Sequence, residues 1–385
     1  LTSKRLPLDL PFRAWAAAMA SLAIFLAANG VGVIFTGMEH SLHILCALLA
    51  VSGLLEAAEG EEYNWALPTA LALGPLVRYE ALLMTLLGAL ALMLMGRWKQ
   101  AALGMGAAAS GLGGFSFFLH NLGLGILPSS VQAKSAVAGS EGASLISRFL
   151  SGALNNWEKA LETPAYLFFI AAALALLIPG RDSKWKWASL AAMGSVAGHF
   201  LLGDRGWMLR YEIYLYASLL PLMLLGLLSG QSLLASSKLK LPSLIGLGLT
   251  GAVLCIQSYD NFLITPLASG TIHRQQRQMM RFVRDFHKAP AAVNDLGWVA
   301  FAGGHKTLDL WGLGSKEALK LRKSNTRSDW VLPLCRREGA SLMMIYPSWI
   351  YPRSAIPDTI YHLGTLKSEW PYAHGAAEPQ VEFYA

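Results

Sequence analysis

Thr36-Gly37-Met38-Glu39-His40 separates two long apolar segments and places the carboxylate of Glu39 between them. Residues 14–36 before it and residues 41–55 after it carry almost no polar side chains. An ionisable side chain at a membrane boundary costs free energy unless it is solvated, paired or used. Glu39 therefore marks either a functional site or a simple turn, in which Gly37 bends the backbone and Glu39 caps the next helix.

The composition predicts a protein with many membrane-spanning helices. Hydrophobic residues make up 54% of the 385 residues and charged residues only 14%, too apolar for an ordinary soluble domain. The net charge of +7 comes from basic residues scattered in short loops, so the bilayer is an expected partner and nucleic acid is not. Three cysteines, Cys46, Cys255 and Cys335, share no short spacing, which argues against a disulfide framework or a thiolate metal site.

Nine apolar segments are candidate membrane spans, at residues 14–36, 40–58, 65–78, 80–96, 100–127, 164–179, 187–203, 211–229 and 242–262. Alternating them across a membrane puts most loop lysines and arginines on one face, which the positive-inside rule makes cytoplasmic. The outer face then receives Glu39, Arg78 to Glu80, residues 128–163, Gly203 to Tyr211 and everything after residue 262.

The outer segments contain two further predicted elements. Apolar residues recur at helical spacing from Ile146 to Leu161, which predicts a helix lying in the membrane interface or a loop helix packed on the bundle. Residues 263–385 predict an extracytoplasmic α/β domain. It begins with an arginine-decorated helix whose apolar side holds Met280, Val283 and Phe286. Strands are expected at residues 291–293, 298–302 and 341–346, and a helix at 316–322.

Four polar clusters share the predicted outer face: Glu39-His40, Arg78-Tyr79-Glu80, Lys134, and the run from Asp204 to Arg210. Together they supply cations for a lipid phosphate and carboxylates for a reacting hydroxyl group. Each has a simpler explanation, because charges at helix ends commonly form structural ion pairs and a loop lysine is commonly solvated.

The order of these motifs resembles one family. The motifs are Gly37-Met38-Glu39, Arg78-x-Glu80, Pro128 with Ala133-Lys134, Gly203-Asp204 with Arg210, Asp295-x-Gly297, and Asp309-Leu310-x-Gly312. This order resembles the GT-C superfamily of membrane glycosyltransferases, which use polyprenyl-phosphate sugars as donors. Within it, the chain is most similar to the bacterial mannosyltransferase-like or arabinofuranosyltransferase-like branch. The resemblance covers about residues 10 to 345.

The resemblance implies a mainly α fold, with a polytopic helix bundle at residues 1–262 followed by an extracytoplasmic α/β domain at 263–385. It implies transfer of a sugar to an envelope glycan, lipid or protein at the outer face of the bacterial cytoplasmic membrane. Glu39 matches the acid of the second outward loop. The implied contacts to the donor phosphate are Lys134, Arg78, Arg205 and Arg210. The implied substrate contacts are His40, Glu80 and Asp204, while Asp295 and Asp309 are acceptor-side residues or structural turn residues.

One element of the family pattern has no counterpart. Such enzymes carry an Asp in their first outward loop, and no outward loop precedes Glu39 in this sequence. Two helices and that loop are therefore expected upstream of Leu1, and this polypeptide is expected to lack the catalytic base. Glu39 could orient either the acceptor or a bound divalent cation. The sequence does not assign a metal site there, because no His and Asp residues have recognisable ligand spacing. Two other functions remain open, a secondary transporter and a non-catalytic polyprenyl-lipid-binding or assembly subunit.

Overall fold

The computed structural model describes residues 10–61, 64–134, 144–204, 209–236, 238–324, 327–352, 356–368 and 378–385. The chain is mainly helical and divides into two compact units. Unit 1 comprises residues 1–117 and 149–262, and unit 2 comprises residues 118–148 and 263–385. Residues 118–148, which the sequence analysis assigned to the helical module, thus group with the C-terminal unit.

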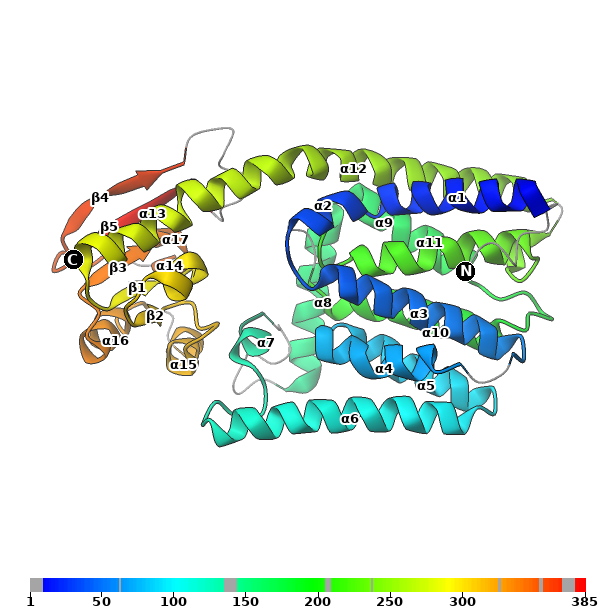
Figure 1. Ribbon diagram of the computed structural model, residues 1–385, viewed down its shortest axis with the longest axis horizontal. Helices are drawn as coiled ribbons and strands as arrows, with labels where there is room; N and C mark the ends of the chain where they lie inside the picture. The colour runs from blue at the N-terminus through cyan, green and yellow to red at the C-terminus, as the bar shows by residue number, and fades with distance from the viewer. Residues whose placement is uncertain are drawn as a thin grey trace. The chain divides into compact units, whose positions relative to one another are not determined.

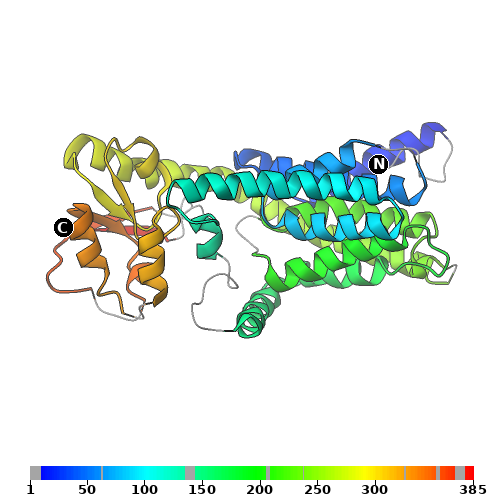
Figure 2. The same ribbon diagram turned by 90° about the horizontal axis from the view of Figure 1, so that it is seen from below.

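Unit 1 is a bundle of helices running side by side, with α6 along its outside (Figures 1 and 2). Its helices are α1 (Leu10–Ala27), α2 (Gly30–Phe35), α3 (His40–Ala58), α4 (Ala66–Val77), α5 (Ala81–Leu94), α6 (Trp98–Asn121), α8 (Leu145–Leu161), α9 (Pro164–Leu176), α10 (Lys186–Leu202), α11 (Ile213–Leu228) and α12 (Lys240–Arg274), with a 3-10 turn at Leu233–Ala235. Helices α6, α8 and α12 each continue across a boundary between the units.

The nine expected apolar segments coincide with helices, but the first of them is broken. Helix α1 ends at Ala27 and α2 begins at Gly30, with Asn29 between them in a left-handed conformation at φ 49°. Left-handed backbone cannot continue a right-handed helix, and asparagine is one of the few residues that adopts it readily. Residues 14–36 are therefore two helices rather than one continuous span.

Among the described helices, three are long and apolar enough to cross a membrane, namely His40–Ala58, Trp98–Asn121 and the continuous segment Lys240–His287. The bent pair Phe149–Leu161 and Pro164–Leu176 counts as a fourth if it forms one broken span. The shorter apolar helices include α4 with 12 residues and α11 with 16. A helix of that length covers less than the roughly 20 residues that a bilayer core requires.

Helix α11 forms the centre of unit 1, because almost every side chain from Ile213 to Leu227 is buried. A helix that is apolar on all sides fits only where other helices surround it. Around it, α3 and α4 approach closely at Gly53. A Cβ atom at Gly53 would lie 2.5 Å from the Cβ atom of Leu67, so only glycine permits this contact.

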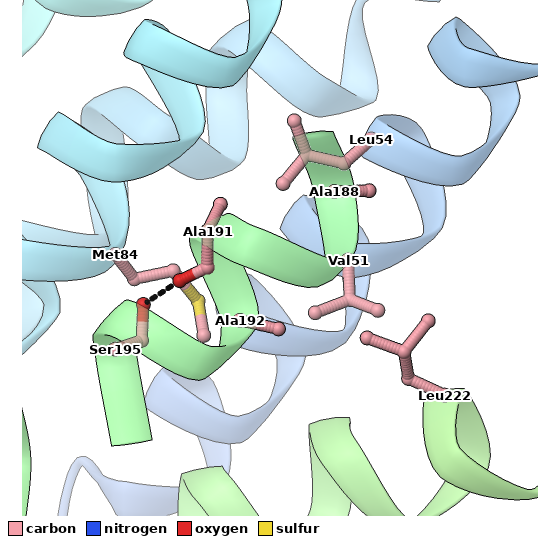
Figure 3. Close-up of a pocket in the computed structure, with 8 residues that line it drawn as sticks. All are labelled: Val51, Leu54, Met84, Ala188, Ala191, Ala192, Ser195 and Leu222. Atoms are coloured by element: carbon pink, nitrogen blue, oxygen red, sulfur yellow. Dashed lines mark hydrogen bonds between the residues drawn. The ribbon is translucent and has the colours of Figure 1, made fainter. Parts of the chain in front are cut away.

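A small apolar cavity lies among α3, α5, α10 and α11 (Figure 3). Seven of the eight residues drawn there are apolar, and the eighth, Ser195, donates its hydroxyl to the carbonyl oxygen of Ala191 at 2.9 Å. Since the Ser195 hydroxyl already donates its proton within α10, the residues drawn around this cavity offer no free hydrogen-bond donor to orient a ligand. The functional site must therefore be sought elsewhere in the bundle.

Unit 2 contains a five-stranded sheet with the strand order β2-β1-β3-β5-β4. Strand β1 pairs in parallel with β2 and β3, while β5 pairs antiparallel with β3 and β4. The elements of unit 2 are α7 (Ser129–Lys134), α13 (Gln276–Arg281), a π-helical turn (Phe282–His287), β1 (Ala291–Val293), α14 (Gly297–Ala302), β2 (Thr307–Asp309), α15 (Lys316–Ser324), α16 (Val331–Glu338), β3 (Leu342–Ile345), α17 (Pro347–Ile350), β4 (His362–Lys367) and β5 (Gln380–Tyr384).

Two expectations for unit 2 were wrong. Residues 298–302 form a helix, α14, and not a strand; only Val299 of that helix is fully buried, and Phe301 is 88% exposed. Phe286 does not join Met280 and Val283 in the core, and is 75% exposed. The π-helical turn at residues 282–287 explains the second difference, because its wider turn rotates Phe286 away from the face that an α-helix would give it.

Candidate functional site

A cluster of charged side chains lies at the end of unit 1 where α3 begins. Arg78 donates one guanidinium nitrogen to Glu39 Oε1 at 2.5 Å and the other to Glu80 Oε1 at 2.9 Å. The Arg78 side chain is 10% exposed, whereas that of Glu39 is 41% exposed. Arg78 is therefore a buried bridge between two carboxylates, of which Glu39 faces outward.

The breaks between helices position these three residues. Glu39 and Glu80 occupy the N-cap positions of α3 and α5, where negative charge is favourable, although neither side chain makes a capping hydrogen bond. Arg78 follows α4 in an extended conformation at φ −149° and ψ 132°. This extended residue turns the chain between two short helices and directs the guanidinium toward α3.

A backbone hydrogen bond and the charge of Arg78 favour the ionised form of Glu39. Burial acts to raise the pKa of Glu39, but its backbone hydrogen bond and the Arg78 charge together hold that pKa below its ordinary value. A phosphate bound at Arg78 would have to compete with two carboxylates.

Arg210 brings a second cation into the cluster. It donates to the hydroxyl oxygen of Tyr211 at 2.9 Å and to the sulfur of Met38 at 3.4 Å. The guanidinium carbons of Arg210 and Arg78 lie 4.9 and 5.3 Å from the centroid of the Tyr211 ring. Both cations thus use one aromatic ring, an arrangement that favours positive charge on its face.

Behind the charged layer lies a buried layer of imidazole and phenol groups. His40 Nε2 lies 3.5 Å from Arg78, and His40 is fully buried. His43, one turn further along α3, stacks on the ring of Tyr214 with centroids 4.1 Å apart. The hydroxyl of Tyr214 lies 3.3 Å from His199 Nδ1. Polar residues from α3, α10 and α11 therefore meet at this end of the bundle.

Sequence reasoning missed His43, His199, Tyr211 and Tyr214. The spacing of His40 and His43 places both imidazoles on one face of a helix, which was a usable signal. His199 lies in the last turn of an otherwise apolar helix, the other place where a histidine needs an explanation. The two tyrosines carry no such signal, because tyrosine is common in any buried helix.

Asp204 takes part in a second group of contacts at the same end of unit 1, between α8 and the end of α10. Its carboxylate pairs with Lys159 of α8 at 3.8 Å. The side-chain amide of Asn156, also on α8, donates to the carbonyl oxygens of Leu201 and Gly203 at 3.1 and 2.9 Å. Helix α8 is thus anchored to the end of α10 next to Asp204. Arg205 lies outside the described residues.

The remaining predicted residues belong to unit 2. Lys134 is the last residue of α7, and its side chain lies outside the described residues. Asp309 is the last residue of β2, and its side-chain oxygens accept hydrogen bonds from the backbone N–H groups of Trp311 and Gly314 at 2.8 and 2.6 Å. It closes a turn through Gly312, which has φ 91°.

Asp295 follows β1 and is mostly buried. Its carboxylate accepts a hydrogen bond from the side chain of Gln276 at 2.9 Å. Burial raises the pKa of Asp295, and the nearby negative charge of Asp309 adds to this, although the Gln276 hydrogen bond opposes both. The folded domain therefore holds the Asp295 proton more tightly than the unfolded chain does.

A pH dependence follows from the raised pKa of Asp295. The stability that it contributes is complete below its ordinary pKa of 3.8 and is lost as the pH rises through the higher pKa of the folded state. The substitution Asp295→Asn should remove this loss and stabilise unit 2 at pH 7 relative to the wild type. Hydrogen exchange of the β1 and β3 amides, corrected for intrinsic rates, should be slower in the variant at pH 7. Equal exchange in both proteins across the pH range would contradict the assignment.

No group of three or more His, Cys, Asp or Glu side chains with the arrangement of a metal site occurs in the part of the chain that the structure describes. In that part, the cluster around Glu39 combines two carboxylates with two guanidinium groups. This composition suits an anionic group and a hydroxyl group better than a divalent cation, which prefers several carboxylate oxygens without competing cations.

Comparison with known protein families gives a match within unit 2. No curated protein and no solved structure matches the chain. Residues 270–384 match the model described as "Domain of unknown function (DUF8728)", which covers most of the C-terminal part of unit 2.

Proposed function

We propose that the protein is a membrane glycosyltransferase that uses a polyprenyl-phosphate-linked sugar, with the nine apolar segments of unit 1 in the cytoplasmic membrane. One observation carries the proposal. Glu39, Arg78, Glu80 and Arg210 come from separate helix ends and meet at one end of an apolar bundle. At the membrane interface, the end of an apolar bundle lies at the depth where a lipid-linked donor presents its phosphate and sugar. A fixed set of charges there can contact both reacting groups.

In the proposed reaction, an acceptor hydroxyl attacks the anomeric carbon of the donor sugar. The bond from that carbon to the phosphate oxygen breaks, and the polyprenyl phosphate leaves with the bonding electrons. The hydroxyl proton passes to a base. Glu39 orients the acceptor through its outward carboxylate, Arg210 stabilises the leaving phosphate, and Arg78 holds Glu39 in place. The acceptor is an envelope glycan, lipid or protein at the outer face.

The test is sugar transfer by the full-length protein in nanodiscs. Membranes of the source organism would supply labelled polyprenyl-phosphate sugars and acceptors, and the product would be followed by label transfer. Transfer that depends on Arg210, with a loss on Arg210→Ala, is the expected result. Binding of polyprenyl phosphate without any transfer would overturn the proposal and favour the lipid-binding or assembly role.

A second candidate function, secondary transport, is favoured by the break between α1 and α2. Transporters commonly bind solutes where a helix is interrupted within the membrane, and buried histidines such as His43 and His199 serve proton coupling in such sites. Counterflow of a solute by proteoliposomes containing the protein, without glycosyl transfer, would establish this function instead. Transfer without counterflow would exclude it.

A further inference from the structure

Helix α8 presents an apolar face that the described residues of unit 1 leave largely exposed, although the ring of Trp157 meets that of Phe200 of α10 edge-on with centroids 6.0 Å apart. Leu150, Leu154, Trp157 and Leu161 recur at helical spacing and are between 49% and 64% exposed. Ser151, Asn155, Glu158 and Glu162 lie on another side and are also exposed. The third side, Gly152, Asn156 and Ala160, is buried against the bundle. The helix thus has one face for protein, one for water and one apolar face left over.

The direction of α8 differs from that of its neighbours. It lies across the end of unit 1, while the other helices run along the bundle (Figure 1). The segment Phe149–Leu161 is bent by 113° from Pro164–Leu176, and Pro164 at the start of α9 prevents one helix from continuing into the other. If α9 runs along the membrane normal, α8 lies nearly in the membrane plane.

We infer that α8 is an in-plane membrane helix whose Leu150, Leu154, Trp157 and Leu161 insert at the boundary between lipid headgroups and acyl chains. This inference rests on the proposed membrane embedding of unit 1 but not on sugar transfer. The apolar face matches the acyl side of that boundary, the face with Glu158 and Glu162 matches the aqueous side, and tryptophan favours this depth.

Two other arrangements fit the exposed face less well. A re-entrant arm that dips into the bilayer would bring Ser151, Asn155 and Glu158 into hydrocarbon, where polar side chains are costly. A protein partner would have to cover α8 beside the exposed Phe168 of α9, although Phe168 belongs to a helix of the proposed bundle and is itself expected to face lipid. The bilayer satisfies both helices at once.

The consequence for the candidate site is a fixed depth. Helix α8 contacts the end of α10 through Asn156, and its Lys159 pairs with Asp204. An in-plane α8 therefore holds Asp204 at the level of the lipid headgroups. This is the level at which the phosphate of a lipid-linked substrate lies.

Depth measurements along α8 test the inference. Single cysteines would be introduced at residues 150, 154, 161, 158 and 249 of the full-length chain, with Cys46, Cys255 and Cys335 replaced by alanine. Each would carry a spin label, and its exposure to oxygen and to a water-soluble nickel complex would be measured in nanodiscs. Leu249 of α12 is 63% exposed and serves as the control for bundle embedding.

We expect labels at residues 150, 154 and 161 to be oxygen-exposed about 5–10 Å below the interface, with the label at 158 nickel-exposed. Because a bend of 113° leaves α8 about 23° from the membrane plane, the depths at residues 150 and 161 should differ by about 6 Å. A re-entrant arm would instead give depths that differ by roughly 16 Å between residues 150 and 161. That result, nickel exposure at all positions, or protection from both reagents by a protein partner would overturn the inference. Nickel exposure at residue 249 would refute membrane embedding itself, whatever α8 does.

Discussion

Replacing Arg78 with methionine should lower the free energy of unfolding by about 3–5 kcal/mol, the largest stability effect expected for a single substitution in unit 1. The Arg78 side chain is 10% exposed and pairs with both Glu39 and Glu80. Methionine fills similar space but leaves two carboxylates close together without a cation. Their desolvation and mutual repulsion then oppose folding of the bundle end.

The measurement is reversible unfolding of the full chain in one detergent, followed by tryptophan fluorescence. Arg78→Lys keeps the charge but cannot reach both carboxylates in a fork, so it should be intermediate. Arg97→Met is the matched control, because Arg97 lies beyond the other end of α5 and forms no ion pair with the described residues. If Arg78→Met and Arg97→Met have equal free energies of unfolding, the ion pairs of Arg78 with Glu39 and Glu80 do not stabilise this end of the bundle.

Replacing Glu39 with glutamine should lower sugar transfer at least about 100-fold while leaving stability almost unchanged. The amide keeps an oxygen for Arg78 but removes the negative charge that orients the acceptor hydroxyl. Glu39 is 41% exposed, and ion pairs at such exposed groups contribute little to folding. A large effect on transfer with a small effect on unfolding would distinguish the functional role of Glu39 from the structural role of Arg78.

Glu56→Gln provides the control for Glu39→Gln, since Glu56 lies near the opposite end of the same helix, α3. Initial transfer rates and unfolding curves would be recorded for both variants and the wild type. Unchanged transfer in Glu39→Gln would refute the role of Glu39. A loss matched by Glu56→Gln would show a general effect of charge on the bundle.

Most helices of unit 1 were predictable because they are apolar runs bounded by charges or glycine. The same logic located Glu39, Arg78 and Glu80, since charges excluded from apolar helices collect in the breaks between them. The break at Asn29 was not predictable, because one polar residue inside an apolar run leaves the hydrophobic pattern intact. What it changes is a backbone angle, which composition does not encode.

The contacts within the site were less predictable than its location. His43 and His199 are far apart in sequence and meet only through the packing of α3, α10 and α11 around Tyr214. In unit 2 the strands are only three to six residues long. Such short apolar runs do not distinguish strand from helix, which is why residues 298–302 were assigned to a strand.

The close approach of α3 and α4 at Gly53 links the position of one end of α3 to the packing at its other end. They pack along their length, with Gly53 against Leu67 near one end and Arg78 bonded to Glu39 at the other. The 14 residues from Glu39 to Gly53 span about 21 Å of helix. A methyl group at residue 53 would push α3 away from Leu67 of α4 and tilt the two helices relative to each other. This tilt would move Glu39 away from Arg78. The position of the Glu39 carboxylate therefore depends on the absence of a side chain at residue 53, about 21 Å away along α3.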